Sequence, residues 1–175
     1  VSRDWSSDVC SSDLGLPDHI QEVLREHVLW LDSGGSKGKR AVLDGVNLRG
    51  AELSGVYLSG AGLRAANLSG ANLLGAKLLL TDLRDANMSD ADLRRADLSG
   101  AVMANADLRR AKLSYALFQP VALRDARGAA TGKSAPTILL GAKLADANLA
   151  FADLSEAMTD VGVVVPDAPL RKVAH

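Results

Sequence analysis

The chain has 175 residues, a formal net charge of −1, and a composition that is 47% apolar but only 3% aromatic. A nearly neutral chain has no bulk electrostatic reason to bind nucleic acid or an anionic membrane surface. No apolar run approaches the roughly 20 residues that span a bilayer. A core with so few aromatic rings favours a coiled coil or a repeat over an ordinary globular domain.

The chain begins with a segment that carries no structural signal. Residues 4–14 read DWSSDVCSSDL, which resembles the translation of a short-read sequencing adapter. We therefore interpret residues 1–14 as an artefact and exclude them from the fold. The only cysteine, Cys10, lies in this segment, so it says nothing about disulfides or redox compartment. We expect a cytoplasmic location, although on this interpretation the native N-terminus is missing.

Residues 15–40 are expected to form an amphipathic helix followed by a linker. The helix is predicted between Asp18 and Asp32, and Gly34-Gly35 ends it. Its apolar face consists of residues at helical spacing, namely Ile20, Val23, Leu24, His27 and Leu31. A solenoid exposes core and unpaired backbone at its ends, so we expect this helix to cap the first coil of the repeat that follows.

A repeat of five residues occupies most of the chain. From Ala41 to Asp125 there are seventeen consecutive repeats, with a central Leu in all but those centred on Met88, Met103 and Phe118. The residue two positions earlier is Ala in thirteen repeats, and Asn or Asp often separates the two. Residues two apart point to the same side of an extended chain, so Ala and Leu face inward. Because five is odd, each repeat must turn a corner, where glycine is frequent.

Three of the repeats carry a family resemblance. A-N-L-S-G (Ala66–Gly70), A-D-L-R-R (Ala91–Arg95) and A-D-L-S-G (Ala96–Gly100) resemble the A-[DN]-L-x-x signature of pentapeptide-repeat proteins, and the pattern extends from Ala41 to about Glu156. The resemblance implies an all-β solenoid, a right-handed quadrilateral β-helix in which four repeats form one coil, here with the short N-terminal helix as a cap. We assign this β-helix to residues 41–160.

The period is interrupted once. Leu123 and Leu139 are sixteen residues apart, one more than three repeats. We expect a loop near residues 126–136 to absorb the difference within one continuous tower, which we favour over two separate domains. The loop contains G-A-A-T-G-K-S, which resembles a phosphate-binding loop. It has one residue too few between its glycines and no helix after it, so a flexible loop is the better interpretation.

Beyond the tower, residues 161–175 are expected to form a C-terminal cap or tail. Their apolar run, residues 161–165, is predicted to cover the last coil or to pair with a second copy of the chain. Dimers commonly form through such ends in this family, so the resemblance also implies a homodimer.

The sequence contains no pattern that indicates catalysis or a bound cofactor. His19 and His27 are eight residues apart, too far for the i, i+4 pair of a helical metal site. The serines occupy solvent-facing corners without a histidine beside them. We therefore predict no catalytic, cofactor-binding or metal-binding residues, no cofactor, and no enzymatic activity.

Two outer features are candidates for contact with a partner. Arg64, Arg84 and Arg124 are predicted to share one column of the stack as a basic column. Between Ala41 and Asp160, however, thirteen acidic residues balance thirteen basic ones, which favours a lattice of salt bridges over an anion-binding face.

The second feature is a candidate protein-contact patch. Leu74, Leu79 and Leu80 stand where neighbouring repeats carry Ser, Arg or Gly, and Tyr57 lies one coil below. Contiguous exposed apolar residues mark contacts. Packing of the N-terminal helix or of the loop against these leucines is the alternative explanation.

These features predict a bacterial, non-enzymatic protein-binding or scaffold module with an unidentified protein partner and no direct nucleic-acid or membrane contact. The resemblance suggests an alternative, a DNA mimic that modulates gyrase or another type II topoisomerase and protects it from quinolones. The neutral tower disfavours this alternative, because a mimic must reproduce the negative field of DNA. A stabilising segment of a larger polypeptide is a third interpretation.

Overall fold

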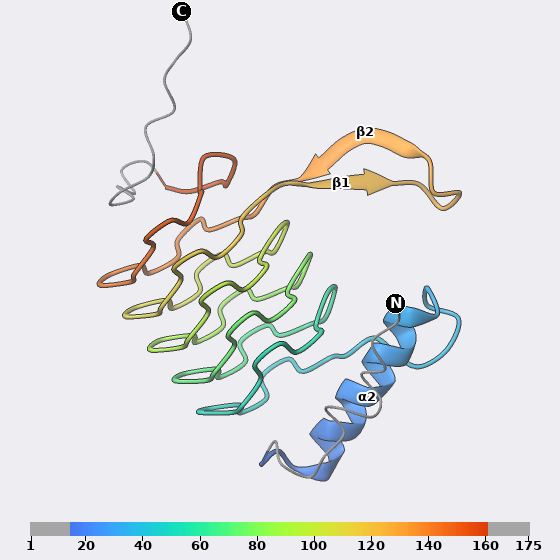
Figure 1. Ribbon diagram of the computed structural model, residues 1–175, viewed down its shortest axis with the longest axis horizontal. Coiled ribbons are helices and arrows are strands. Elements are labelled where there is room, and N and C mark those ends of the chain that lie inside the picture. Colours follow the sequence, from blue (N-terminus) through green and yellow to red (C-terminus); the bar gives the residue numbers. More distant parts are fainter. Residues whose placement is uncertain (1–14, 161–175) are drawn as a thin grey trace, which may run out of the picture.

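The computed structural model describes residues 15–160, which form one helix, a tower of stacked coils and a projecting hairpin (Figure 1). The helix α2 spans Asp18–Asp32, and the strands β1 (Val121–Arg124) and β2 (Ala130–Ala135) form a two-stranded antiparallel sheet. Within residues 15–160 no helix is long and apolar enough to cross a membrane. The artefact assigned to residues 1–14 and the C-terminal cap assigned to residues 161–175 lie outside the described residues.

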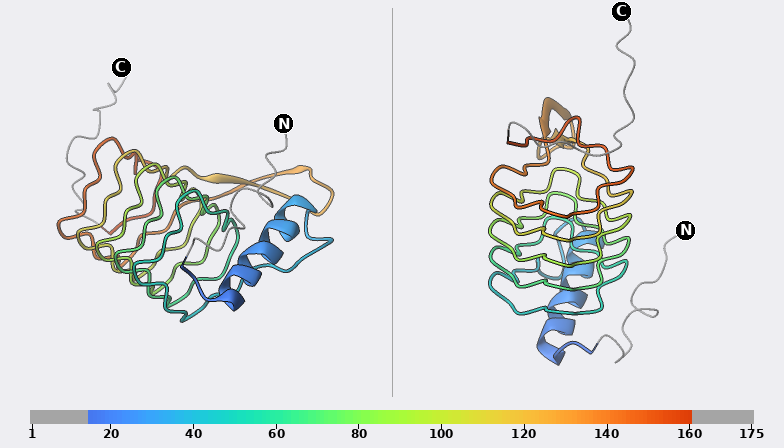
Figure 2. Two further views of the ribbon diagram at one scale, coloured as in Figure 1. Left: turned by 60° about the horizontal axis from the view of Figure 1, so that its bottom comes forward. Right: turned by 90° about the vertical axis from the view of Figure 1, so that its left-hand side faces the viewer.

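The tower is held together by parallel bridges between residues twenty positions apart. In the first coil the bridges start at Val42, Asn47, Glu52 and Tyr57, and each partner lies one coil further along the chain. Four bridges a coil give the tower four sides, as the family resemblance predicted, and Figure 2 shows the coils stacked in two further views. Each bridge is a single residue, because the chain turns before a longer strand can form.

The inside of the tower is lined by the central residues of the repeats. All of them from Leu43 to Phe118 are at most 2% exposed, so the predicted inward register is confirmed. Fully burying a leucine side chain stabilises the fold by about 1.5–3 kcal/mol. Backbone hydrogen bonds join each inner coil to the coils on both sides of it. Leu63 N–H donates to the Asp82 carbonyl of the next coil at 2.8 Å, and Gly62 N–H donates to the Ala41 carbonyl of the previous coil at 3.0 Å.

The corners of the coils require left-handed backbone. At one of them, Ala66 N–H donates to the Leu63 carbonyl at 3.2 Å, and Ala65 has a φ of 53°. Glycine fills this position at many corners, as predicted. At others, non-glycine residues adopt φ values of 53–61°, namely Ala65, Leu80, Asp85, Asp90, Arg95, Asn105, Arg110, Tyr115, Asp146 and Phe151. Left-handed backbone costs a non-glycine residue about 1–2 kcal/mol, and the ladder above and below imposes it.

The interruption of the repeat is a β-hairpin rather than a flexible loop. Ile138 bridges Val102 from thirty-six residues away, sixteen more than the usual twenty, so residues 121–136 are an insertion at one corner. Leu123, predicted as the centre of a repeat, instead lies in β1 and is only partly buried, and Leu139 takes its place in the core at 2% exposed. The stretch that resembles a phosphate-binding loop runs into β2, so no helix N-terminus follows it.

α2 closes the first coil, and its predicted bounds are confirmed. Ile20, Leu24 and His27 are buried, and the two aliphatic residues join the core of the tower. His27 Nδ1 accepts a hydrogen bond from Ala41 N–H at 3.1 Å, and its ring stacks on Trp30 with centroids 5.5 Å apart. Because backbone groups at the end of a solenoid have no coil beyond them, His27 satisfies an N–H that would otherwise be buried without a partner.

The strained corners predict an unusual stabilising substitution. Ala65→Gly removes the β-carbon from a left-handed residue that is exposed, and should raise the free energy of unfolding by about 0.5–1 kcal/mol. Gly75→Ala introduces the same strain at a corner with no atom within 4 Å of the new β-carbon, and should lower stability by a similar amount. Urea unfolding of both variants tests this, and changes of equal sign would contradict it.

The buried histidine predicts acid sensitivity of the cap. Burial lowers the pKa of His27; the Ser59 carbonyl opposes this shift, and the positive charge of Arg40 adds to it. The unfolded chain binds a proton below its ordinary pKa of about 6.5, whereas the folded chain keeps the ring neutral. Stability is therefore fully present above about pH 6.5 and declines as the pH falls below that value.

Thermal melts at neutral and mildly acidic pH, compared between wild type and His27→Gln, test this dependence. Glutamine can still accept from Ala41 N–H but does not titrate, so the variant should lose less stability on acidification. Equal losses in the two proteins would assign the acid sensitivity to other groups.

Candidate functional site

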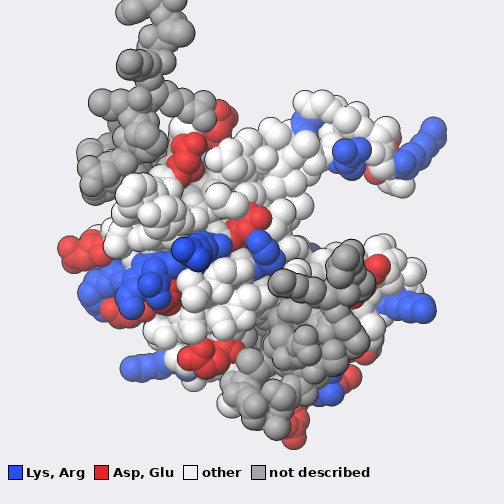
Figure 3. All heavy atoms as spheres, viewed as in Figure 1, with Lys and Arg blue, Asp and Glu red and all other residues white. Residues whose placement is uncertain are grey.

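Most arginines of the tower are paired with aspartates of the tower itself. On the face seen in Figure 3, basic and acidic side chains of the tower lie side by side. Arg94 pairs with Asp92 at 2.6 Å, and the hydrogen bond from its guanidinium holds the pKa of that carboxyl below its ordinary value. Arg110 pairs with Asp90 of the coil below at 2.7 Å, with the same effect on the pKa of Asp90. Two further repeats show the Asp92–Arg94 arrangement, namely Asp82–Arg84 and Asp107–Arg109. The predicted lattice of salt bridges is present on these sides.

Where the residue between Ala and Leu is Asn or Asp, it also caps a turn. Asp92 Oδ1 accepts from the backbone N–H of Arg94 at 3.2 Å, and Asn67 Oδ1 accepts from the backbone N–H of Ser69 at 3.1 Å. Asn and Asp both supply this oxygen, which explains why either residue can occupy the position. Sequence reasoning assigned these residues to solvent and missed the capping, although a short polar residue two places before a corner N–H was a usable signal.

The predicted basic column is only partly formed. Arg64 and Arg84 lie in one column, with Arg64 Nε 3.9 Å from the Asp82 carboxylate that also pairs with Arg84. Arg124 does not belong to the column. It lies in β1, where its Nη1 donates to the Gly128 carbonyl at 2.8 Å, because the hairpin insertion shifts the register by sixteen residues.

The predicted leucine patch is divided between two corners. Leu74 lies at one corner, and Leu79 and Leu80 lie at the next, where Leu80 borders the root of the hairpin. Tyr57 lies on the side between these corners, one coil below Lys77. Leu74 and Leu80 therefore belong to different surfaces.

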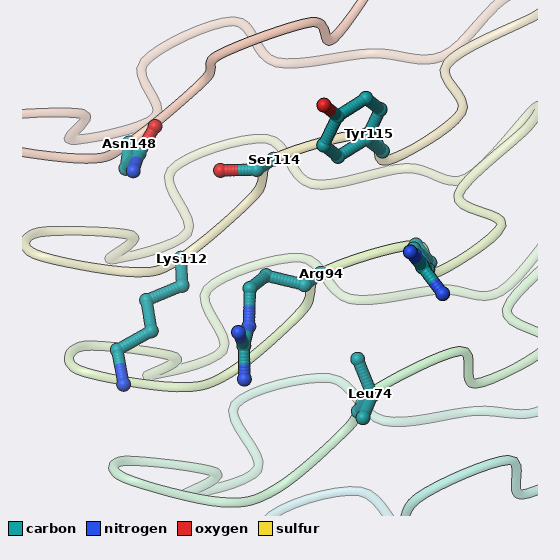
Figure 4. A pocket seen from close by; sticks show the side chains of 7 residues that line it. Leu74, Arg94, Lys112, Ser114, Tyr115 and Asn148 are labelled. Atoms are coloured by element: carbon teal, nitrogen blue, oxygen red, sulfur yellow. The ribbon is translucent and has the colours of Figure 1, made fainter.

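A hollow of about 660 Å³ lies over the corner that holds Leu74 (Figure 4). Its lining comes from four successive coils and consists of Leu74, Arg94, Arg95, Lys112, Ser114, Tyr115 and Asn148. Figure 4 shows the Lys112 and Arg94 side chains next to one another, with Tyr115 above them and Leu74 below. Cationic, aromatic and aliphatic groups thus meet at one place.

Tyr115, which lines the hollow, belongs to an exposed aromatic pair. The rings of Tyr115 and Phe151 are stacked, with centroids 4.7 Å apart and planes 9° from parallel. Tyr115 is 53% exposed, Phe151 is 64% exposed, and Leu117 beside them is 48% exposed. Both aromatic residues also hold a φ of 61° at corners where glycine would be unstrained. Large rings that neither fill the core nor suit the backbone indicate a contact surface.

The cations of the hollow are not all neutralised. Arg94 is paired with Asp92, whereas Arg95 and Lys112 have no salt-bridge partner within residues 15–160. Lys112 lies one coil above Asp92, and its charge helps to lower the pKa of that carboxyl. Such a surface suits carboxylates flanked by apolar side chains, since aromatic residues and arginine are enriched where proteins bind one another. In the same part of the chain, no three His, Cys, Asp or Glu side chains are placed to hold a metal ion.

Comparisons with known proteins agree with the repeat. The family model for pentapeptide repeats matches residues 39–64, 63–100 and 91–127, with 8 copies. The pentapeptide repeat protein Rfr23 from the cyanobacterium Cyanothece 51142 is 26% identical, with 72% of this chain and 88% of that chain covered and a TM-score of 0.48. A comparison with characterised protein sequences finds no match.

Two other solved structures also match this chain over most of its length. A pentapeptide repeat protein from the Arabidopsis thaliana thylakoid lumen is 27% identical, with 81% of this chain and 79% of that chain covered and a TM-score of 0.46. QnrB1, a plasmid-mediated fluoroquinolone resistance protein, is 18% identical, with 67% of this chain and 59% of that chain covered and a TM-score of 0.28.

The turn cap predicts that amide and carboxylate are interchangeable at the polar position. Asp92→Asn keeps the capping oxygen and should cost less than about 0.5 kcal/mol, because exposed ion pairs contribute little. Asp92→Ala also leaves the corner N–H without its partner and should cost about 1 kcal/mol. Urea unfolding measures the free energy of unfolding of both Asp92 variants. Arg94→Gln is the control, because it removes the salt bridge to Asp92 and leaves the cap in place. Equal losses for Asn and Ala would mean that the cap contributes nothing.

Proposed function

Because the chain belongs to the pentapeptide-repeat family, we propose that it is a non-enzymatic protein-binding or scaffold module that holds its partner at the corner around Tyr115 and Phe151. Family membership also implies that its four-sided coil is right-handed. The observation that carries the proposal is the stacked and exposed aromatic pair beside two unpaired cations, Arg95 and Lys112.

Three features of the tower support this proposal. Its core ladder makes the corner rigid, so a partner loses little free energy in ordering the binding surface. The paired aspartates and arginines of the other sides present a nearly neutral surface, which leaves the aromatic corner as the distinct feature. The hollow below the aromatic pair accepts a side chain, and an anchor in a pocket is a common centre of binding energy.

Replacing the aromatic pair tests the function without harming the fold. In Tyr115→Gly/Phe151→Gly both substitutions relieve left-handed strain, so the tower should melt no lower than wild type. Loss of two exposed aromatic anchors should weaken partner binding by more than about tenfold. The measurement is quantitative affinity capture followed by mass spectrometry, with wild type and variant in parallel.

The matched control is Ala65→Gly/Asp146→Gly, which relieves the same strain at corners outside the aromatic face. It should capture partners as wild type does. A double aromatic variant that captures every partner at the wild-type level would refute the proposed binding face.

For the alternative function, modulation of gyrase, we predict a negative result. The tower and hairpin carry equal numbers of acidic and basic residues, and four of the aspartates are neutralised by arginines, so the negative field of DNA is not reproduced. Stoichiometric protein should leave gyrase supercoiling unchanged, both with and without a fluoroquinolone. Inhibition, or protection from the drug, would replace the scaffold proposal with topoisomerase recognition.

Three expectations about the context of the protein stay predictions. The homodimer was expected through residues 161–175, which lie outside the described part of the chain. The cytoplasmic location was expected on general grounds, and fractionation of cells that produce the protein would test it. The absence of direct nucleic-acid and membrane contact likewise stays a prediction.

A further inference from the structure

One turn beside the hollow lacks the cap that its neighbours have. In the coil below, Asp92 Oδ1 accepts from the corner N–H of Arg94 at 3.2 Å. Lys112 occupies the same position one coil above Asp92, and a lysine side chain has no acceptor atom. Within residues 15–160 the corner N–H of that repeat, on Ser114, therefore has no hydrogen-bond acceptor.

The molecule itself shows what takes up such an N–H group. Gly62 leaves its repeat without a cap, and the corner N–H of Arg64 donates instead to the Asp44 carboxylate of the coil below at 2.9 Å. A carboxylate from outside the repeat thus replaces the missing cap. At the Ser114 corner the coil below presents two arginines, so the described chain supplies no such carboxylate there.

Further donors surround Ser114 N–H. Lys112 and Arg95 line the same hollow as Ser114, and within residues 15–160 neither cation has a salt-bridge partner. Figure 4 shows the Ser114 hydroxyl directed toward the space between Lys112 and Asn148. A backbone N–H, a hydroxyl and two cations are therefore available to one anion.

Asn148 adds a donor from the coil above. Its Oδ1 accepts from Ala150 N–H at 3.0 Å, so its amide nitrogen faces away from that turn, and Figure 4 shows this nitrogen on the side of Lys112. Lower in the same column, Asn72 Nδ2 donates to Glu52 Oε2 of the coil below at 2.7 Å. Asn148 has the same relation to a carboxylate placed beside Lys112.

The acidic residues of the tower do not fill this place. Asp92 lies one coil below Lys112, where it forms its own salt bridge and caps its own turn. Asp97 and Asp153 lie on the next side of the tower, where each caps its own turn. Since the charge of Asp92 is balanced by its own partner, Arg95 and Lys112 leave the hollow with a net positive charge.

Apolar side chains flank the donors. Figure 4 places Leu74 below them and Tyr115 above them, and both side chains are exposed. An inorganic phosphate or a nucleic-acid backbone would bury nothing against these two groups. A carboxylate with apolar neighbours on its own chain would use the donors and the apolar flanks together.

We propose that the Ser114 corner binds an acidic side chain, flanked by apolar residues, of a partner protein. The carboxylate takes the place of the missing cap: it accepts from Ser114 N–H and from Asn148 Nδ2, and Arg95 and Lys112 supply opposite charge. The flanking side chains pack on the leucine and the tyrosine of the hollow. This inference rests on the proposed binding function of the aromatic corner and names the chemistry that the partner presents there.

An NMR titration of the isotope-labelled full chain tests the contact at the atom concerned. The probe is acetyl-Leu-Asp-Leu-amide, whose only charge is its side-chain carboxylate, and the comparison peptide has Asn in place of Asp. The acidic peptide should shift the Ser114 amide resonance and bind at least about tenfold more tightly than the neutral one. Ala145 N–H also follows a lysine, Lys143, but lies outside the hollow, so its resonance should stay unchanged.

Two substitutions at Lys112 separate the contribution of the N–H group from that of the charge. Lys112→Asn removes the cation and supplies an oxygen to Ser114 N–H, as Asn67 does for its own turn. Lys112→Gln removes the same cation, but its longer side chain should not cap the turn, just as the Glu52 carboxylate binds Asn72 instead.

Lys112→Asn should therefore weaken binding of the acidic peptide by more than about tenfold, while it melts no lower than wild type because the turn gains a cap. Lys112→Gln should weaken binding only severalfold. The matched control, Lys143→Asn, adds a cap on another side of the tower and should change the Kd by less than about twofold.

Three results would overturn the carboxylate site: no shift at Ser114, equal losses for Lys112→Asn and Lys112→Gln, or inorganic phosphate that binds as tightly as the acidic peptide. Failure of the proposed function is seen separately, in the affinity capture of partners. Normal capture by Tyr115→Gly/Phe151→Gly would refute the binding face itself. Loss of capture by that variant with normal capture by Lys112→Asn would leave the face in place and refute the carboxylate site.

Discussion

A left-handed residue at nearly every corner is the constraint on which the four-sided coil depends. In an extended chain successive side chains point to opposite faces, so a repeat of five residues would turn every second leucine outward. The leucines stay inward only because the backbone turns at the corner between one repeat and the next. The ladder of hydrogen bonds between coils imposes that geometry on glycine and on Arg95, Tyr115 or Phe151 alike. Side chains at these corners point away from the core, so their identity is limited by strain rather than by packing.

Local periodicity explains which parts of the structure were predictable. The inward leucines and α2 follow from spacings of five residues and of one helical turn, and both are read within a short window of sequence. The hairpin was not predictable in this way, because a sixteen-residue insertion and three repeats with a one-residue slip give the same distance from Leu123 to Leu139. That ambiguity misplaced Arg124. It also hid the contact of Tyr115 with Phe151, which depends on the register across the insertion.

The protein divides its charge between two roles. On the sides of the tower, aspartates cap the turns and hold arginines, so charge is used for local structure. On the linker and the hairpin, the described cations form no salt bridge, and Arg40 and Arg124 each donate to a backbone carbonyl instead. Composition alone reports a neutral protein, because acidic residues elsewhere in the chain offset the cations of the linker and the hairpin in the sum. The cations of the hairpin are seen to lie apart from the paired charges of the tower only once the insertion is placed.

The uniform twenty-residue register also bears on how such a gene can change in length. Duplication or deletion of twenty codons adds or removes one whole coil and returns every later residue to the side it occupied before. A change of five codons keeps the leucines inward but rotates everything downstream by one side. Phe151 would then no longer stack on Tyr115, even though the fold is intact. Length variation in whole coils therefore keeps every residue in its column, whereas variation in single repeats between two stacked residues moves one of them to another side.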